Sequence, residues 1–95
     1  MQFLVTALDY TDTDAPGRRQ ANREAHLAGA TRLLAEGNIL SAGAILDDDG
    51  KMIGSTLHME FNDRSQLEAW LERDPYITGK VWEKIEIRQA RFLPT

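Results

Sequence analysis

Hydrophobic and polar positions follow two periods along the chain, a period of two in four segments and a helical stripe in two others. Together they predict, in chain order, a strand over 2–10, a helix over 18–36, strands over 39–46 and 52–61, a helix from 62 or 63 to 74, and a strand over 81–92. Residues 11–17 are expected to form a loop, and residues 76–80 a loop or short turn. The order strand, helix, strand, strand, helix, strand predicts an α+β fold of ferredoxin-like βαββαβ topology with a four-stranded antiparallel sheet.

Turn and cap residues support these boundaries. Gly37 follows the first helix where a left-handed C-cap belongs, and Asp49-Gly50 marks a hairpin turn. Asn62 or Asp63 is expected to cap the second helix. Asp74-Pro75 should end it, because the residue before a proline avoids the helical conformation.

The hydrophobic pattern leaves one face of the predicted sheet without a cover. Both helices of this topology cover the same face, because both crossovers are right-handed. The first strand nevertheless places Leu4 and Leu8 on its other face, and the strand over 39–46 is apolar on both faces. An exposed apolar face of this size is unusual for a monomer. We therefore expect a single domain over 1–95 that forms a homodimer through its helix-free sheet faces.

Charge and composition narrow the classes of partner. The chain carries 11 Lys and Arg against 15 Asp and Glu, a net charge of −4, with both signs spread along the sequence. Because no basic stripe is present, we expect neither nucleic acid nor an anionic membrane as partner. No apolar stretch approaches the length of a membrane span, and the N-terminus lacks the positive region of a signal peptide. The absence of cysteine excludes disulfides and thiolate chemistry, and we expect a cytoplasmic protein.

Two residues are candidates for proton transfer. His26 lies at the rim of the apolar stripe of the first helix, formed by Leu27, Ala30 and Leu34, and it is either a partly exposed helix histidine or a general acid or base. Asp74 is either a turn former or a functional carboxylate. At a helix C-terminus a negative charge needs a compensating cation or donor, and a histidine on the neighbouring helix would serve.

Other positions suggest contacts with a small ligand. Arg23 could bind an anionic group, although a solvated helix arginine is the simple alternative, and Tyr76 could line a cleft or only pack on the last strand. Two serines and two glycines in the predicted strands could either contact a ligand or have only a structural role; these are Ser41, Gly43, Gly54 and Ser55.

Metal and cofactor sites are not predicted. His58 and Glu60 share a strand face, but no third ligand is evident. The acidic turn over 47–50 lacks the remaining ligand positions and the closing Glu of a calcium-binding loop. The chain also carries no phosphate-binding glycine loop, dinucleotide fingerprint or nucleophile elbow. We expect no bound metal and no cofactor.

Four short motifs resemble one known family. Arg23-Glu24-Ala25-His26-Leu27, Ser41-Ala42-Gly43, Gly54-Ser55 and Asp74-Pro75-Tyr76 occur in the order and at the spacing seen in YCII-related (YciI-like) proteins of the dimeric α/β-barrel superfamily. The resemblance covers nearly the whole chain. It implies a ferredoxin-like domain that dimerises through its sheet, with His26 and Asp74 as a His–Asp pair in a cleft. Related enzymes, a dehydrochlorinase and more distantly an isomerase, act on small oxygenated rings by proton transfer.

Three functional hypotheses remain open from the sequence. The first is a cofactor-independent isomerase or lyase, in which His26 moves a proton, Asp74 orients the imidazole and Arg23 anchors a small oxygenated or aromatic-derived substrate. The second is a dimeric module that binds a small ligand without turnover. The third is a structural dimerisation domain in which His26 and Asp74 only satisfy each other. The dyad hypothesis requires direct or water-mediated contact between these two side chains.

Overall fold

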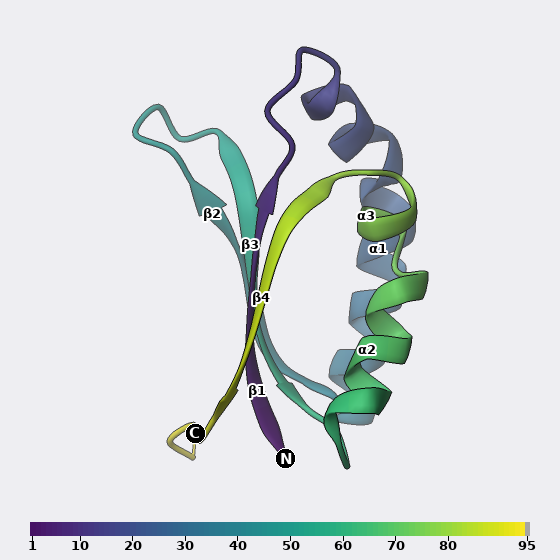
Figure 1. The fold of residues 1–95 in the computed structure, drawn as a ribbon, viewed down its shortest axis with the longest axis vertical. Helices are drawn as coiled ribbons and strands as arrows, with labels where there is room; N and C mark the ends of the chain where they lie inside the picture. The colour runs from purple at the N-terminus through teal and green to yellow at the C-terminus, as the bar shows by residue number, and fades with distance from the viewer. Residues whose placement is uncertain (95) are drawn as a thin grey trace.

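A four-stranded sheet forms one layer of the molecule and the helices form the other in the computed structural model, which describes residues 1–94 (Figure 1). The elements are β1 (Gln2–Asp9), α1 (Ala15–Glu36), β2 (Ile39–Leu46), β3 (Met52–Glu60), α2 (Arg64–Arg73), α3 (Pro75–Thr78) and β4 (Trp82–Ala90). The strand order is β2-β3-β1-β4, and every neighbouring pair is antiparallel. This arrangement confirms the predicted ferredoxin-like α+β fold.

Two segments predicted as loops contain helix. The helix α1 begins at Ala15 rather than at residue 18, so Pro16 and Gly17 lie in its first turn. A proline is tolerated there because the first backbone N–H groups of a helix have no intrahelical acceptor. The segment after Asp74 forms the single-turn helix α3, whose start is capped by the Asp74 side chain. A proline therefore lies in the first turn of a helix at both of these places.

The predicted caps are confirmed. Gly37 has φ 86° and ends α1 in the left-handed region, where a residue with a Cβ would be strained. The carboxylate of Asp63 accepts the backbone N–H of Gln66 at 3.0 Å and begins α2. Asp74 ends α2 in an extended conformation before Pro75.

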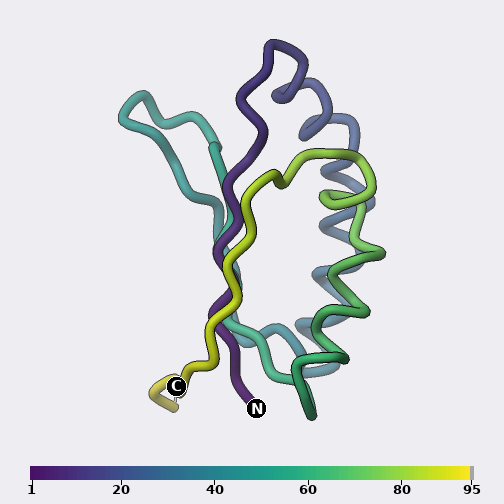
Figure 2. The backbone as a smooth tube through the Cα atoms, in the orientation of Figure 1, coloured from purple at the N-terminus to yellow at the C-terminus, as the bar shows by residue number. Residues whose placement is uncertain are grey.

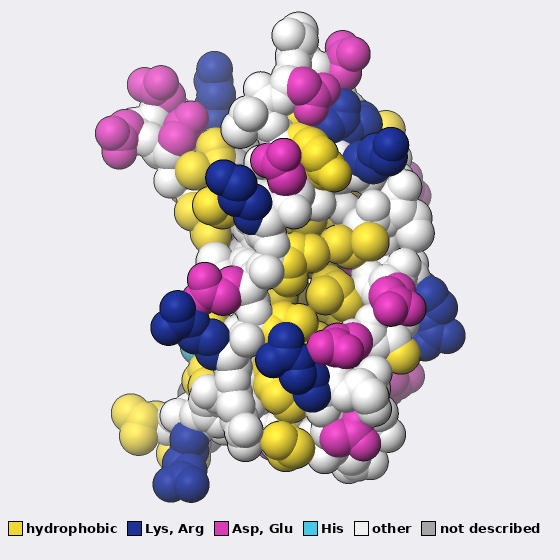
Figure 3. Space-filling view, in the orientation of Figure 1, with side chains coloured by type: hydrophobic (Ala, Val, Ile, Leu, Met, Phe, Trp, Pro, Cys, Tyr) yellow, Lys and Arg dark blue, Asp and Glu magenta, His cyan; other side chains and the backbone are white. Residues whose placement is uncertain are grey.

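The hydrophobic core lies between the two layers. Alternate residues of β1, Phe3, Val5 and Ala7, point toward the helices and are buried. They pack with residues of the other elements, chiefly Leu33, Leu57, Met59, Leu67, Leu71, Tyr76 and Trp82. Figure 3 shows hydrophobic side chains between the sheet layer and the helix layer at one edge of the molecule. The sheet face away from the helices takes no part in this core.

The buried face of α1 differs from the predicted stripe. Ala30 and Leu33 are buried, but Leu27 and Leu34 are 43% and 49% exposed. Their places on the inner face are taken by Arg19 and His26, which are 8% and 7% exposed. The buried face of α1 is therefore rotated from the predicted one. A hydrophobicity pattern cannot reveal this change, because it treats polar side chains as surface residues even where they have buried partners.

The helix-free face of the sheet is open in the single chain. Figures 1 and 2 show α1, α2 and α3 on the same side of the sheet. The side chains of Leu8 and Leu40 are 40% and 43% exposed, and β2 is exposed along most of its length. The two ends of the chain pair in the sheet, where Gln2 lies opposite Ala90. Within residues 1–94, no helix has the length and apolar character needed to cross a membrane.

Candidate active site

The side chains of His26 and Asp74 meet between the helices. His26 lies in the middle of α1, and Asp74 lies at the junction of α2 and α3. The distance from His26 Nδ1 to Asp74 Oδ2 is 2.8 Å. This contact confirms the one that the dyad hypothesis required. Both residues are buried, so His26 is less exposed than its place at the rim of the predicted stripe suggested.

The environment of Asp74 fixes which nitrogen of His26 carries a proton. Asp74 Oδ2 also accepts the backbone N–H of Tyr76 at 3.0 Å. This bond supplies the donor that a carboxylate at the end of α2 needs. A carboxylate only accepts hydrogen bonds, so His26 Nδ1 is the donor in the pair. In the neutral imidazole Nε2 is then the proton acceptor.

Two aromatic rings hold the imidazole plane. The ring of Tyr76 stacks on His26 with a centroid distance of 3.8 Å and an interplanar angle of 8°. The indole of Trp82 meets the imidazole edge-on at 5.3 Å. Burial raises the pKa of the Tyr76 hydroxyl above its ordinary value. The ring of His26 is therefore fixed by one hydrogen bond and two aromatic contacts.

A second polar cluster adjoins the pair and was not predicted from the sequence. Arg19 Nη2 donates to the Gly54 carbonyl at 2.8 Å and to Ser55 Oγ at 3.2 Å. Arg19 Nε lies 3.1 Å from Asp9 Oδ2, and Trp82 Nε1 donates to Ser55 Oγ at 3.1 Å. Burial raises the pKa of Asp9, and the charge of Arg19 opposes this effect. Arg19 thereby joins α1 to β1 and β3.

Helical spacing is the signal that could have found Arg19. It precedes Arg23 by four residues and His26 by seven, so all three lie on one face of α1. Asp9 carries no comparable signal, because it lies at the end of β1 and meets Arg19 only once the sheet and α1 have packed together. The guanidinium carbon of Arg19 lies 5.0 Å from the centre of the Tyr76 ring. The cluster and the His–Asp pair thus share Tyr76.

A cavity of about 260 Å³ lies between α1 and the β2–β3 hairpin, and the pair is reached from it. Five of the predicted site residues line this cavity, namely Arg23, His26, Gly43, Ser55 and Tyr76. Asp74 lies behind His26, outside the lining. The imidazole is therefore the side chain of the pair that faces the cavity.

Two predicted ligand contacts do not line this cavity. Ser41 is exposed on β2, opposite His58 of β3. Gly54 is buried, and a Cβ there would approach the Ala7 carbonyl oxygen to 2.3 Å. The close approach that this glycine permits is between β3 and β1. Its carbonyl, which accepts Arg19, still connects it to the site.

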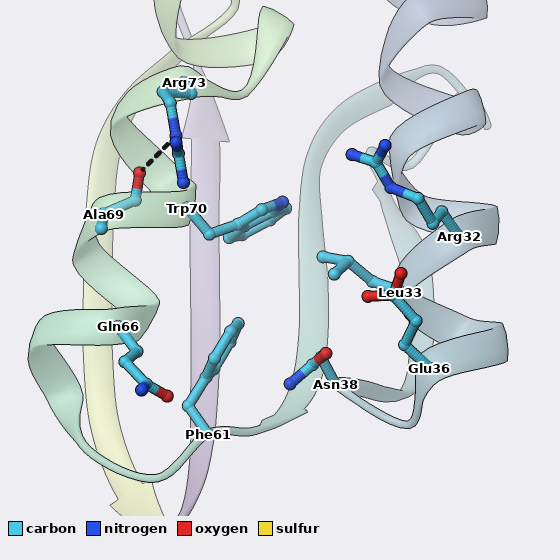
Figure 4. Close-up of a pocket in the computed structure, with 9 residues that line it drawn as sticks. All are labelled: Arg32, Leu33, Glu36, Asn38, Phe61, Gln66, Ala69, Trp70 and Arg73. Carbon is cyan, nitrogen blue, oxygen red and sulfur yellow. Dashed lines mark hydrogen bonds between the residues drawn. The ribbon is translucent and has the colours of Figure 1, made fainter.

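A larger cavity of about 700 Å³ adjoins the first one. Arg19, Arg23 and Met52 line both. A further hollow of about 510 Å³ lies between α1 and α2, where Figure 4 shows Arg32 and Leu33 facing Trp70. This hollow contains none of the predicted site residues.

His58, considered as a metal ligand, instead stacks on the ring of Phe92 with centroids 4.0 Å apart. Among residues 1–94, no three His, Asp or Glu side chains lie close enough together to hold a metal ion.

Comparison with known proteins finds one matching family model and similar proteins from several bacteria. The model of the YCII-related domain family matches residues 1–91. The protein YciI of Escherichia coli is 32% identical over 94 residues, which cover 93% of this chain and 94% of that protein. A Haemophilus influenzae protein is 30% identical over the same coverage.

Solved structures give the same result. The structure of 5-chloro-2-hydroxyhydroquinone dehydrochlorinase from Burkholderia phenoliruptrix, in complex with 2,5-dihydroxybenzoquinone, is 27% identical, with a TM-score of 0.82 over 96% of this chain and 94% of that one. A dimeric ferredoxin-like protein from Jannaschia shares the fold, with a TM-score of 0.53 and 13% identity over 96% and 98% of the two chains. The chain belongs to the YCII-related domain family.

Proposed function

We propose that this protein is a cofactor-independent enzyme of the isomerase or lyase type, which transfers a proton on a small oxygenated ring. One observation carries the proposal: His26 lines a cavity while its Nδ1 is held by Asp74 Oδ2 at 2.8 Å. A histidine with one nitrogen fixed by a carboxylate presents the other as a general base. Once protonated, the same nitrogen is a general acid.

Isomerisation and elimination require only such a group. In an isomerisation, His26 Nε2 takes a proton from one atom of the substrate and returns it to another. In the loss of HCl from a chlorinated hydroxyhydroquinone, His26 takes a hydroxyl proton and delivers it to the chlorine-bearing carbon. Loss of a second hydroxyl proton then expels the C–Cl electron pair as chloride, and the ring becomes a quinone. Both reactions leave the oxidation state of the protein unchanged.

The surrounding residues take supporting roles in this proposal. Arg23 lines the cavity and would pair with an anionic oxygen of the substrate. Asp74 orients the imidazole and stabilises its protonated form. Support for an oxygenated ring comes from the dehydrochlorinase at 27% identity, whose structure holds 2,5-dihydroxybenzoquinone.

The test is release of chloride from 5-chloro-2-hydroxyhydroquinone, followed together with formation of the quinone, in the wild-type protein and in His26→Asn. We expect turnover in the wild type and a decrease of about 10²–10⁴-fold in the variant. His58→Asn is the matched control, because His58 lies on Phe92 and lines neither cavity.

A non-catalytic binding module is the second candidate, and it is favoured by the limited exposure of the His26 side chain, 9%. It predicts that the wild type binds 2,5-dihydroxybenzoquinone but releases no chloride and isomerises no lactone or halophenol in a substrate panel. That result would contradict the enzymatic proposal.

A further inference from the structure

The larger cavity lies next to the candidate active site, and neither His26 nor Asp74 lines it. The β1–α1 connection, the first turns of α1 and the β2–β3 hairpin enclose it. Figure 1 shows the hairpin turn and this connection at the same end of the molecule. Its volume of about 700 Å³ lies within the range of about 300–1,000 Å³ typical of small-molecule sites.

The carboxylates in its wall mostly have partners within the protein itself. Asp9 pairs with the buried Arg19. Asp12 receives two hydrogen bonds from Arg18, both of 2.7 Å. Asp47 accepts two backbone N–H groups of its own turn, each at 2.9 Å. Apart from Asp9 Oδ1, which is buried without a hydrogen-bond partner, a ligand in this cavity therefore meets few carboxylate oxygens that need a donor.

The remaining wall is largely apolar. Its apolar members are Leu8, Tyr10, Ala15, Pro16, Met52 and Ile53. Ile53 and Met52 are 38% and 46% exposed. Covering such side chains with an apolar group of a ligand removes hydrocarbon surface from water, which favours binding.

Arg23 is the cation at the junction of the two cavities. It lines both of them. Among the residues that the structure describes, no carboxylate forms an ion pair with it. Arg19, the other arginine at the junction, is already neutralised by Asp9. Lys51, on the hairpin, also lines the larger cavity and forms no ion pair among the described residues, but it is exposed. An anionic oxygen on a ring that lies against His26 is therefore expected at Arg23, which lines both cavities.

We propose that the larger cavity binds an uncharged apolar substituent of the ligand, whose ring lies in the smaller cavity against His26 and whose anionic oxygen pairs with Arg23. This inference rests on the proposed function for the position of the ring. It extends that function to a substrate class, an anionic oxygenated ring with an alkyl or aryl tail. A ring without a tail would leave most of the larger cavity to solvent.

The test is calorimetric binding of 2,5-dihydroxy-1,4-benzoquinone, which is anionic at neutral pH, and of its 3-butyl and 3-hexyl homologues. Full burial of each methylene tightens binding by up to about fourfold, and we expect at least about 100-fold between the parent and the hexyl homologue. Ile53→Glu should remove this gain, so that the hexyl homologue binds this variant no more tightly than the parent compound does. Leu46→Glu, on the same hairpin but outside the cavity, is the matched control. Arg23→Gln should weaken all three ligands by the same factor.

Equal affinity for the parent and the hexyl homologue would overturn the inference, and so would an unchanged gain in Ile53→Glu. Failure of all three ligands to bind would overturn it as well. The chloride-release assay is independent of these measurements. Tail-dependent binding in a protein that releases no chloride would leave the tail site standing and contradict the enzymatic proposal alone.

Discussion

The Nδ1 atom of His26 is held by a carboxylate that is itself fixed by a backbone N–H. Replacement of Asp74 by Asn should leave this backbone bond intact, because the amide oxygen can still accept the Tyr76 N–H. Because one oxygen serves both partners, the amide oxygen can also still accept His26 Nδ1, but the neutral Asn removes the charge that stabilises the protonated imidazole. We expect kcat to fall by about 10²–10⁴-fold with an unchanged circular dichroism spectrum.

Asp63→Asn is the control for that variant, because Asp63 caps the other end of α2 and does not contact His26. A rate close to that of the wild type in Asp74→Asn would show that the pair is structural. Loss of the native circular dichroism spectrum in both variants would instead show that the decrease in kcat comes from lost helix capping.

Gly54 makes a different contribution at the residue scale. Because its added Cβ would lie 2.3 Å from the Ala7 carbonyl oxygen, Gly54→Ala must push β3 away from β1. We expect the free energy of unfolding to fall by about 1–3 kcal/mol, measured by urea denaturation. Gly43→Ala is the matched control, since its Cβ would meet only a Thr56 methyl group at 4.0 Å. Equal stability of the two variants would contradict this account.

The candidate site was predictable from sequence only in part. His26, Asp74, Arg23, Ser55, Gly43 and Tyr76 were identified, largely because their motifs resemble a family, and they lie at or next to one cavity. Asp9 and Arg19 were missed, because an ion pair between a strand end and a helix start exists only after the layers have packed. Ser41 shares a motif with Gly43 but lies on exposed strand.

At the scale of elements, one arginine connects the start of α1 to the segment before β4. Arg18 forms two hydrogen bonds with Asp12, and its Nε donates to the Lys80 carbonyl at 2.9 Å. The hydrogen bonds from Arg18 lower the pKa of Asp12 from 3.8 to about 2. The loop over 10–14 is thereby held against the end of α3.

This shift predicts how the contribution of Asp12 depends on pH. Because the pKa is lower in the folded chain, the ion pair stabilises the fold above about pH 4, and this contribution is lost as the pH falls toward about 2. Asp12→Asn should be less stable than the wild type at pH 7, by a small amount because the pair is exposed. Thermal melts should show the difference vanish near pH 2. A difference that persists at pH 2 would contradict the ion pair.

The elements themselves were predicted with few errors, and the errors share a cause. Strand 39–46 and the caps at Gly37 and Asp63 follow from local chemistry, which a sequence contains. The early start of α1, the single turn of α3 and the exposure of Leu27 and Leu34 depend on tertiary contacts. Asp74 shows this dependence most directly, since its side chain caps α3 and holds His26 at once.

At the scale of the whole molecule, the open sheet face leads to a prediction about assembly. Leu8, which also borders the larger cavity, and the exposed strand β2 lie outside the core. We expect a homodimer through these faces at micromolar concentration, measured by sedimentation velocity. Leu8→Asp should give monomer or aggregate, because a charge buried in an apolar interface is unfavourable.

Leu34→Asp is the control for assembly, because this equally exposed leucine lies on the helix layer. A wild-type monomer at this concentration would contradict the predicted dimer. A normal dimer in Leu8→Asp would place the interface elsewhere.

The distance along the chain between the site residues has a consequence for folding kinetics. His26 and Asp74 are 48 residues apart, Arg19 and Gly54 are 35 apart, and Ser55 and Trp82 are 27 apart. Contacts of such long range form slowly, since loop closure must precede them. The first two of these contacts join the two halves of the chain. Ligand binding should therefore return only with the slowest refolding phase, after the helices have regained their far-ultraviolet signal.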